Sequence, residues 1–272
     1  MDFINKIPEE PLDTYIQGIV YYKGYKPEHD KDRFLPDCTT NLIIDFGDEP
    51  KFIYHNDTLK VKQPCEIAWF SGMHSRYLTI SSGFDSEMMV ITFKPGFNYP
   101  FINRSLHHLN NKVLPATEIF GDSVLQLRKE LMSINTGDLK IRFASSWLLS
   151  ILTDVSFSEE IIRHFVKEIQ AAPDLVNLNN IAKRSGYSQK QFIHLFKKYV
   201  GLTPKQFHKI VRFNEILQAI HSKEDIDWIK IAVGCGYYDQ AHFIKDFQEF
   251  SGLNPEKYMV DQGEWAHYIP IR

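Results

Sequence analysis

The segment that decides the fold is NLNNIAKRSGYSQKQFIHLFKKYVGLTPKQFHKIVRF, from Asn177 to Phe213. A first short helix is expected to stop at Ser185-Gly186, because glycine readily adopts the positive φ of a tight turn. Ser188 and Gln191 have the spacing of a capping box, which marks the start of a second helix. Apolar side chains recur along that helix at i, i+3, i+4 and i+7, namely Phe192, Leu195, Phe196 and Tyr199. This pattern predicts a helix-turn-helix unit.

The charge of this segment differs from that of the whole chain. From Lys183 to Arg212 there are eight Lys or Arg residues and no Asp or Glu, whereas the chain of 272 residues has a net charge of −3 and a pI near 6.4. A basic stretch without acids suits a polyanion, because phosphate contacts release condensed counterions. The overall acidity predicts weak non-specific DNA affinity. Taken alone, the segment has an alternative interpretation as an ordinary solvated pair of helices.

A second copy of the pattern follows about 50 residues later. Gly236-Tyr237 repeats Gly186-Tyr187, and after the turn the offset grows by one residue. The extra residue is expected around Tyr238-Asp239, with Asp239 as the N-cap of the next helix. The residues that recur at the longer offset are Phe243, Phe247, Gly252, Leu253 and Pro255. Asp246 stands where an apolar side chain is expected, which weakens the packing predicted for this second unit.

The two units, joined by one helix at 207–221, resemble the DNA-binding domain of the AraC/XylS family of transcription regulators. The matching stretches are IAKRSGYSQKQFIHLFKKYVGLTPKQF and WIKIAVGCGYYDQAHFIKDFQEFSGLNPEKY, within roughly 175–260. The resemblance implies that each unit places its second helix in a major groove, with the two insertions about one helical turn, roughly 34 Å, apart.

Site residues are implied by the same resemblance, carried over by position. The residues expected to read bases are Lys190, Ile193, His194, Gln240, Ala241, His242 and Lys245. The residues expected at phosphates are Lys183, Arg184, Ser188, Lys197, Lys198, Lys205 and Lys209. Ile193 and Ala241 can offer only apolar contact, for instance to a thymine methyl group.

The N-terminal part reads as short strands separated by turn residues, which is typical of an antiparallel β barrel or jelly roll. The expected strands are Tyr15–Tyr22, Asn41–Phe46, Phe52–Tyr54, Glu66–Ser71, Tyr77–Ile80 and Met88–Phe93. The stretches RFLPDCTTNLIIDFGD, FSGMHSRYLTI and ITFKPGFNYPF resemble the cupin-like sensor domain of some AraC-type regulators. The expected fold class is α+β: a β-barrel domain with flanking helices and an all-α double helix-turn-helix domain.

Three regions are expected along the chain. Residues 1–117 form the cupin-like domain, 118–172 form helices, and 173–272 form the DNA-binding domain with a tail, 261–272, that we cannot assign. The expected helices of the middle region are Ser123–Ile134, Leu139–Leu152 and Glu159–Gln170, with Asp122, Asp138 and Ser158 as N-caps. These helices either provide a dimer contact or cover an open side of the barrel.

The barrel interior is the expected site of a small-molecule effector, because such pockets are mostly apolar and aromatic. The candidate lining residues are Tyr22, Arg33, Phe34, Trp69, Phe70, Arg76, Tyr77 and Phe93. Arg33 or Arg76 could anchor an anionic group. For any single aromatic residue, a plain core position is the simpler alternative.

No motif for catalysis is found. His29, His55, His74, His107 and His108 lack metal-ligand spacing on the expected strands, and there is no nucleophile elbow or phosphate loop. We therefore expect no enzyme activity, catalytic residue, metal or cofactor. The rival reading is a metal-dependent cupin-like enzyme fused to a helical interaction module. A third reading is a constitutive regulator whose barrel only dimerises.

The remaining expectations concern partners and location. The chain opens without a signal peptide, has no apolar run of about 20 residues, and has three cysteines without CxxC spacing. We expect a cytoplasmic, sequence-specific transcription regulator that binds double-stranded DNA and a small-molecule effector. A homodimer, and RNA polymerase if the protein activates, are further expected partners.

Overall fold

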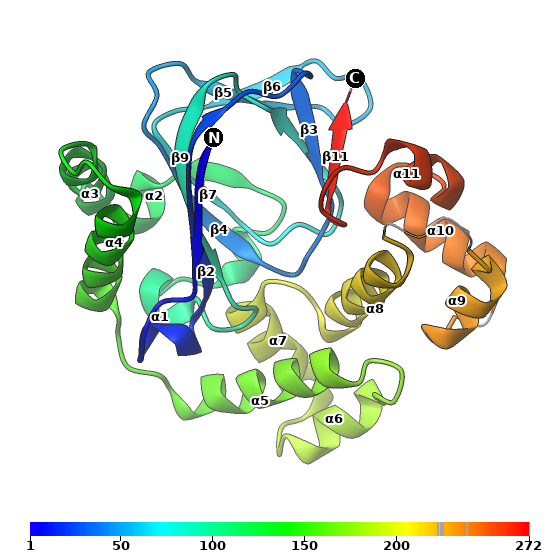
Figure 1. Ribbon diagram of the computed structural model, residues 1–272. Coiled ribbons are helices and arrows are strands. Elements are labelled where there is room, and N and C mark those ends of the chain that lie inside the picture. The colour runs from blue at the N-terminus through cyan, green and yellow to red at the C-terminus, as the bar shows by residue number, and fades with distance from the viewer. Residues whose placement is uncertain (222, 224–225, 238, 272) are drawn as a thin grey trace.

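The computed structural model describes residues 1–221, 223, 226–237 and 239–271. An antiparallel β barrel has helices against one side, and further helices lie around its lower end and opposite side (Figure 1). The predicted fold class, a β-barrel domain followed by a double helix-turn-helix domain, is confirmed. Tyr238, at the expected extra residue of the second turn, lies outside the described residues.

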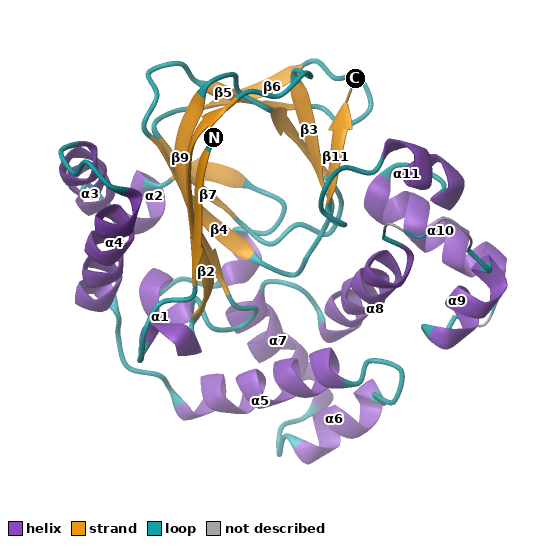
Figure 2. Cartoon of the chain, in the orientation of Figure 1, coloured by secondary structure: helices purple, strands orange, loops and turns teal. Residues whose placement is uncertain are grey.

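Two antiparallel sheets form the barrel (Figure 2). The larger sheet has the order β1-β2-β9-β4-β7-β10, and the smaller has the order β11-β3-β8-β5-β6. The strands are β1 (Asp2–Lys6), β2 (Ile16–Tyr25), β3 (Lys31–Phe34), β4 (Thr40–Asp45), β5 (Lys51–Tyr54), β6 (Val61–Cys65), β7 (Ala68–Ser71), β8 (Leu78–Ser81), β9 (Ser86–Phe93), β10 (Val113–Pro115) and β11 (Tyr268–Ile271). Each of the six expected runs corresponds to a strand.

The larger sheet is apolar on both faces. Its inner face joins side chains of the smaller sheet in a barrel-interior cluster: Ile43, Ile53, Cys65, Trp69, Met88 and Val113. Its outer face lies under the helices α3 (Ser123–Met132) and α4 (Gly137–Ile151). Side chains alternate along a strand, so Trp69 points inward and its neighbour Phe70 points to the helices. Phe70 and Phe93 therefore belong to the outer core, which corrects their expected place in the barrel interior.

The helix starts are set by side-chain caps. Thr136 Oγ1 accepts a hydrogen bond from the amide of Leu139, and the Ser156 side chain caps α5 (Phe157–Ala171) in the same way. The expected caps Asp138 and Ser158 are wrong, because both lie inside the first turn. Asp122 does stand at the N-cap of α3, without a side-chain hydrogen bond. The short elements of this half are η1 (Leu12–Thr14), α1 (Tyr99–Ile102), η2 (Leu106–His108) and α2 (Thr117–Phe120).

The C-terminal helices share one core with α5. They are α6 (Leu178–Arg184), α7 (Gln189–Val200), α8 (Pro204–Ile220), α9 (Trp228–Gly234), α10 (Gln240–Ser251) and α11 (Pro255–Asp261). Ile162, Phe165 and Ile169 of α5 are buried in the same cluster as the apolar faces of α7 and α8. The expected division at residues 172–173 cuts through this cluster, so we propose the domain boundary at 152–156 instead.

The tail that the sequence left unassigned is a strand of the barrel. β11 pairs antiparallel with β3, and the amide of Leu35 donates to the carbonyl of His267 at 2.9 Å. The hydroxyl of Tyr268 lies 2.8 Å from His29 Nε2 and 3.0 Å from Asp32 Oδ1. A segment that follows the last helix therefore completes the smaller sheet.

Removal of β11 tests this arrangement. A chain that ends at Gly263 leaves β3 with an unpaired edge, so the amide of Leu35 should exchange with solvent deuterium roughly tenfold faster or more. Hydrogen–deuterium exchange of the peptide 31–35 measures this. Val260→Ala, at an exposed position of α11, is the control. Equal exchange in the truncated and full chains would contradict the strand pairing.

Candidate nucleic-acid interface

The first helix-turn-helix unit consists of α6 and α7. α6 ends at Arg184 with Ser185 as its C-cap, and Gly186 makes the turn with φ +75°. The predicted capping box is present: Ser188 Oγ accepts from the amide of Gln191 at 3.3 Å, and Gln191 Oε1 accepts from the amide of Ser188 at 3.2 Å. The buried face of α7 carries Phe192, Phe196 and Tyr199. The amino end of α7 is therefore fixed by its own side chains.

The second unit, α9 and α10, repeats this geometry. Gly236 turns the chain with φ +74°, and Asp239 Oδ1 accepts from the amide of His242 at 2.7 Å, as expected for an N-cap. Phe243, Phe247 and Phe250 form the buried face of α10. Both α7 and α10 pack on α8, so one helix carries both units.

The outward faces of α7 and α10 are polar and mostly open. The exposed members of the expected base-reading set are Lys190, His194, Gln240, Ala241, His242 and Lys245, and Ile193 is half-buried. A groove of about 420 Å³ runs beside this face of α7, and Ser158 of α5 forms its other wall. Lys190, Gln191 and His194 line the groove from α7. Both units therefore present polar side chains to solvent.

The expected phosphate residues divide into two groups. Lys183 and Lys205 are exposed, Lys197 is half-buried, and the described residues contain no ion-pair partner for these three. The other four have partners within the protein. Arg184 makes a bidentate pair with Glu168 at 2.7 and 2.8 Å, and the Ser188 hydroxyl donates to Gln191 Oε1. Lys198 and Lys209 take part in the two arrangements below.

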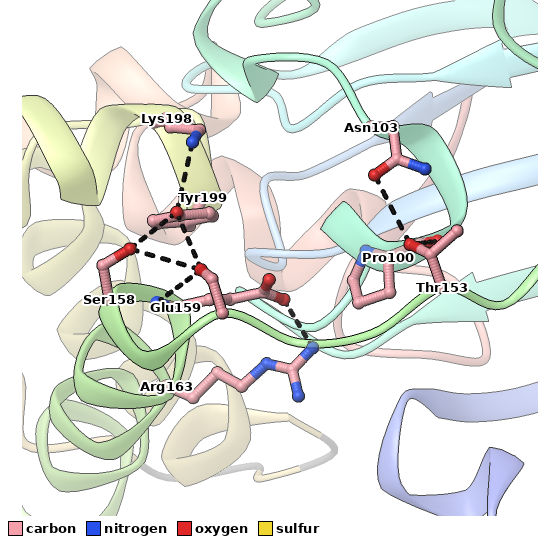
Figure 3. Close-up of polar contacts among 9 residues, drawn as sticks. Pro100, Asn103, Thr153, Ser158, Glu159, Arg163, Lys198 and Tyr199 are labelled. Carbon is pink, nitrogen blue, oxygen red and sulfur yellow. Dashed lines mark hydrogen bonds and ion pairs between the residues drawn. The ribbon is translucent and has the colours of Figure 1, made fainter.

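Lys198 lies at the junction of α7 with α5 and the barrel (Figure 3). Its ammonium group lies 3.2 Å from the hydroxyl of Tyr199, which is also 2.8 Å from Ser158 Oγ, and it lies 4.9 Å from the ring centroid of Tyr99. In the same view Arg163 donates to Glu159 at 2.5 Å, and burial raises the pKa of Glu159 although Arg163 opposes that rise. The position of Lys198 serves packing between helices as well as surface charge.

Asp246 explains the role of Lys209. The Asp246 side chain is buried, and its Oδ1 accepts from Lys209 Nζ of α8 at 2.8 Å. Tyr237 lies nearby; burial raises the pKa of its hydroxyl, and the charge of Asp246 raises it further. The second unit therefore has a buried ion pair between α8 and α10 where an apolar contact was expected.

Loss of Lys209 should destabilise the protein. Lys209→Ala leaves a buried carboxylate without its cation and should lower the free energy of unfolding by about 1–3 kcal/mol in urea denaturation. Adding Asp246→Asn should recover part of this loss, because an amide needs no counterion. Lys205→Ala is the matched control. A Lys209→Ala protein as stable as the control would refute the ion pair.

The expected effector residues do not converge on one cavity. Tyr22 and Trp69 face the barrel interior, and the hydroxyl of Tyr22 donates to Met88 Sδ at 3.0 Å. Phe34 is exposed and packs on Tyr268. Arg33 and Tyr77 face the C-terminal helices, and Arg76 is exposed. Sequence patterns could not separate these positions without the strand register.

A cavity of about 170 Å³ lies instead at the seam between the edge strands β6 and β10. Its lining residues are Ile53, Lys62, Gln63, Leu78, Asn111, Lys112, Val113 and Leu114. Gln63 Nε2 donates to the carbonyl of Val113 at 2.8 Å and so bridges the two edges. The apolar wall continues into the barrel-interior cluster, and Lys62 and Lys112 are exposed. Neither edge strand was expected, so sequence reasoning missed this cavity.

Two negative findings apply to the part of the chain that the structure describes. No group of three or more His, Cys, Asp or Glu side chains there is arranged to hold a metal ion. Among those residues, no helix combines the length and the apolar character needed to cross a membrane.

Comparison with known proteins matches the two halves separately. Residues 181–260 match a family described as a helix-turn-helix domain, and residues 5–115 match a domain of unknown function, DUF6597. The chain is 25% identical to the uncharacterized HTH-type transcriptional regulator YbfI of Bacillus subtilis over 50% of this chain and 48% of that protein. It is 27% identical to the multiple antibiotic resistance protein MarA of Salmonella typhimurium over 35% of this chain and 76% of MarA.

Further comparisons differ in how much of the chain they cover. An uncharacterized HTH-type regulator of Haemophilus influenzae is 27% identical, and the match spans 27% of its length. The chain thus spans about half or less of these two longer regulators, YbfI and the Haemophilus protein. Among solved structures, ToxT of Vibrio cholerae aligns with 90% of this chain and 98% of its own, at 14% identity and a TM-score of 0.46.

Proposed function

Because residues 181–260 form a helix-turn-helix domain of the AraC type, we propose that the protein is a sequence-specific DNA-binding transcription regulator. The observation that carries this proposal is the equivalence of α7 and α10. Each has a capped amino end, a buried aromatic face and an exposed polar face. Helix amino ends favour phosphate, and exposed polar faces can read base edges in a major groove.

We assign base reading to those expected residues whose side chains are exposed to solvent. Lys190 and His194 lie on the open side of α7, and Gln240 and Lys245 lie on that of α10. A lysine suits guanine O6 and N7, and a glutamine suits adenine N6 and N7. Half-buried Ile193 has less side chain available for a thymine methyl group than exposed Ala241.

Phosphate contacts are assigned first to Lys183, Lys197 and Lys205, which have no ion-pair partner among the described residues. Arg184 can join them, because its pair with Glu168 is exposed to water and a phosphate can replace the carboxylate. Lys209 is assigned to the buried pair with Asp246 instead. The first unit therefore supplies more of the electrostatic attraction than the second.

The seam cavity is the proposed effector site. Its volume of about 170 Å³ is below the usual 300–1,000 Å³ of drug-sized pockets, so the ligand is a small metabolite. The apolar wall and the two exposed lysines, Lys62 and Lys112, favour a compact apolar molecule with an anionic group. Such a ligand would regulate by binding one arrangement of the protein more tightly than another.

Two further partners belong to this proposal. α4 covers the barrel with one face and leaves Leu139, Phe143 and Leu149 exposed, so a second copy of the chain can pack there. RNA polymerase is a partner if the protein activates transcription. Sedimentation of the purified protein over a range of concentrations tests the dimer.

The base-reading residues are tested by selection of bound DNA from a random pool. Lys190→Ala or His194→Ala should change the preferred bases in one half-site, at a cost of about 1–3 kcal/mol for the original sequence. Gln240→Ala should change the other half-site. Unchanged sequence preference in all three variants would refute the assignment.

The phosphate residues should behave differently. Lys183→Ala or Lys205→Ala should weaken binding to all sequences alike and reduce the slope of log K against log salt by about 1 for each phosphate that is no longer neutralised. Titrations at several salt concentrations measure this. A change confined to one sequence would show that the residue contacts bases.

The effector site is tested by thermal-shift screening of small metabolites. A ligand at 100 times its Kd should stabilise the folded protein by about 2.7 kcal/mol. Val113→Trp fills the cavity and should abolish the shift. Val61→Trp, in β6 on the other edge of the seam and outside the cavity lining, should keep it. A shift that survives Val113→Trp would place the ligand elsewhere.

A further inference from the structure

The carboxyl ends of both reading helices meet the barrel. α7 ends at Val200 with Gly201 as its C-cap, and α10 ends at Ser251 with Gly252 as its C-cap. These two glycines occupy equivalent positions in the repeat and have φ of +101° and +71°. The last carbonyl groups of a helix lack intrahelical donors and carry partial negative charge, so they need donors from elsewhere.

The first contact is made by the segment around η2. The carbonyl of Gly201 accepts from Asn110 Nδ2 at 2.8 Å and lies 3.2 Å from His107 Nδ1. A Cβ atom at Gly201 would lie 3.1 Å from Asn110 Oδ1 and 3.4 Å from the carbonyl oxygen of Leu106. The glycine therefore permits both the left-handed turn and the close approach of the barrel to α7.

The second contact is made by the smaller sheet. Arg33 Nη1 donates to the carbonyl of Ser251 at 3.1 Å, and the amide of Tyr77 donates to the carbonyl of Phe250 at 3.1 Å. The Arg33 guanidinium lies 4.4 Å from the centroid of the Tyr77 ring. A Cβ atom at Gly252 would lie 2.6 Å from that ring, so a side chain there would collide with it.

Both contacts are made by segments that adjoin or belong to the two sheets of the barrel. Arg33 lies in β3 between β8 and β11, paired with Thr79 on one side and Ile269 on the other. Asn110 lies between η2 and β10, close to the edge of the larger sheet. α10 is thus held by a strand of the smaller sheet, and α7 by the turn that leads into the edge strand of the larger sheet.

We propose that Arg33 and Asn110 are positioning residues through which the barrel sets the relative placement of the two reading helices. This rests on the proposed function, since it assigns these residues a part in DNA recognition. α8 connects the two helices by apolar packing, and the barrel adds a second connection at their carboxyl ends. Their amino ends, which would enter the grooves, are then held at one separation and angle.

The seam cavity lies next to both contacts. Asn111, which follows Asn110, and Leu78, which follows Tyr77, both line it. Asn111 Oδ1 also accepts from the amide of Ser75 at 2.8 Å, so the two segments are hydrogen-bonded to each other. A molecule in the cavity would therefore touch residues next to both contact points, and one that prefers a wider or narrower seam would shift the spacing of the helices.

Spin-label distances test the proposal without DNA. Labels are placed at the exposed positions Gln189 of α7 and Gln248 of α10; the three native cysteines are buried. In full-length protein we expect one narrow distance distribution, and in Arg33→Ala/Asn110→Asp a broader or shifted one. Asn110→Asp is isosteric and replaces the amide donor with a carboxylate that repels the carbonyl of Gly201, so it tests the α7 contact by itself if the double variant does not fold.

A control variant separates the loss of these two contacts from a general effect of the substitutions. Arg104→Ala/Asn5→Asp removes the same residue types from the barrel half; Arg104 Nη1 donates to the carbonyl of Glu118 at 2.8 Å, away from the reading helices. The control should keep the narrow distribution. A folded Arg33→Ala/Asn110→Asp protein with the control's distribution would overturn the proposal.

DNA spacing provides the functional readout. With a selected site, wild-type protein should discriminate against insertion of one base pair between the half-sites, and the double variant should lose about tenfold of that discrimination. The base preference within each half-site should stay the same. Unchanged discrimination would overturn the proposal. If the wild type selects no DNA, the proposed function fails. The spin-label distances still decide whether Arg33 and Asn110 set the placement of the two helices.

Discussion

One continuous apolar core joins the C-terminal helices to the barrel, and the placement of every other feature depends on it. It contains Leu35, Cys38 and Met73 from the barrel half together with Phe165 of α5 and the aromatic faces of α7, α8 and α10. Full burial of one such side chain contributes about 1.5–3 kcal/mol. Contacts between domains of one chain are usually more polar than a core. Here the two halves are held by the same kind of packing that holds each half together.

The buried polar groups refine this packing. Asp246 pairs with Lys209 between α8 and α10, and Glu159 pairs with Arg163 within α5. Arg163 also lies 4.6 Å from the ring centroid of Phe97 in the barrel half. An unpaired buried charge is costly, so the Lys209–Asp246 pair favours one arrangement of α8 against α10. The remaining lysines of α6, α7 and the start of α8 stay at the surface, where they can attract an anionic ligand.

Local signals in the sequence predicted local structure well. The capping box at Ser188, the turns at Gly186 and Gly236 and the cap at Asp239 depend on residues within a few positions of one another. Long-range pairings could not be predicted in this way. The tail remained unassigned because Tyr268 pairs with residues more than 200 positions earlier in the chain, such as Asp32 at a separation of 236. The breaker at 171–174 gave no sign that α5 shares a core with the C-terminal helices, because that packing depends on residues far from it in the sequence.

The candidate sites show the same contrast between local sequence signals and long-range contacts. Exposure on α7 and α10 could be anticipated from helical periodicity, but the partners of Arg184, Lys198 and Lys209 lie on other elements. In the barrel, a change of one position along β7 separates Trp69 from Phe70 by the full thickness of the sheet. Aromatic content alone could not assign these two side chains to the inside or the outside.

The pairing of β3 with β11 also has a consequence for biosynthesis. Ribosomes add about 5–20 residues each second, and Asp32 precedes Tyr268 by 236 positions, so β3 emerges on the order of 10–50 s before its neighbour. During that interval the smaller sheet has an open edge that can pair with strands of other nascent chains. Yield in a cell should therefore depend on translation speed and on chaperones that shield that edge.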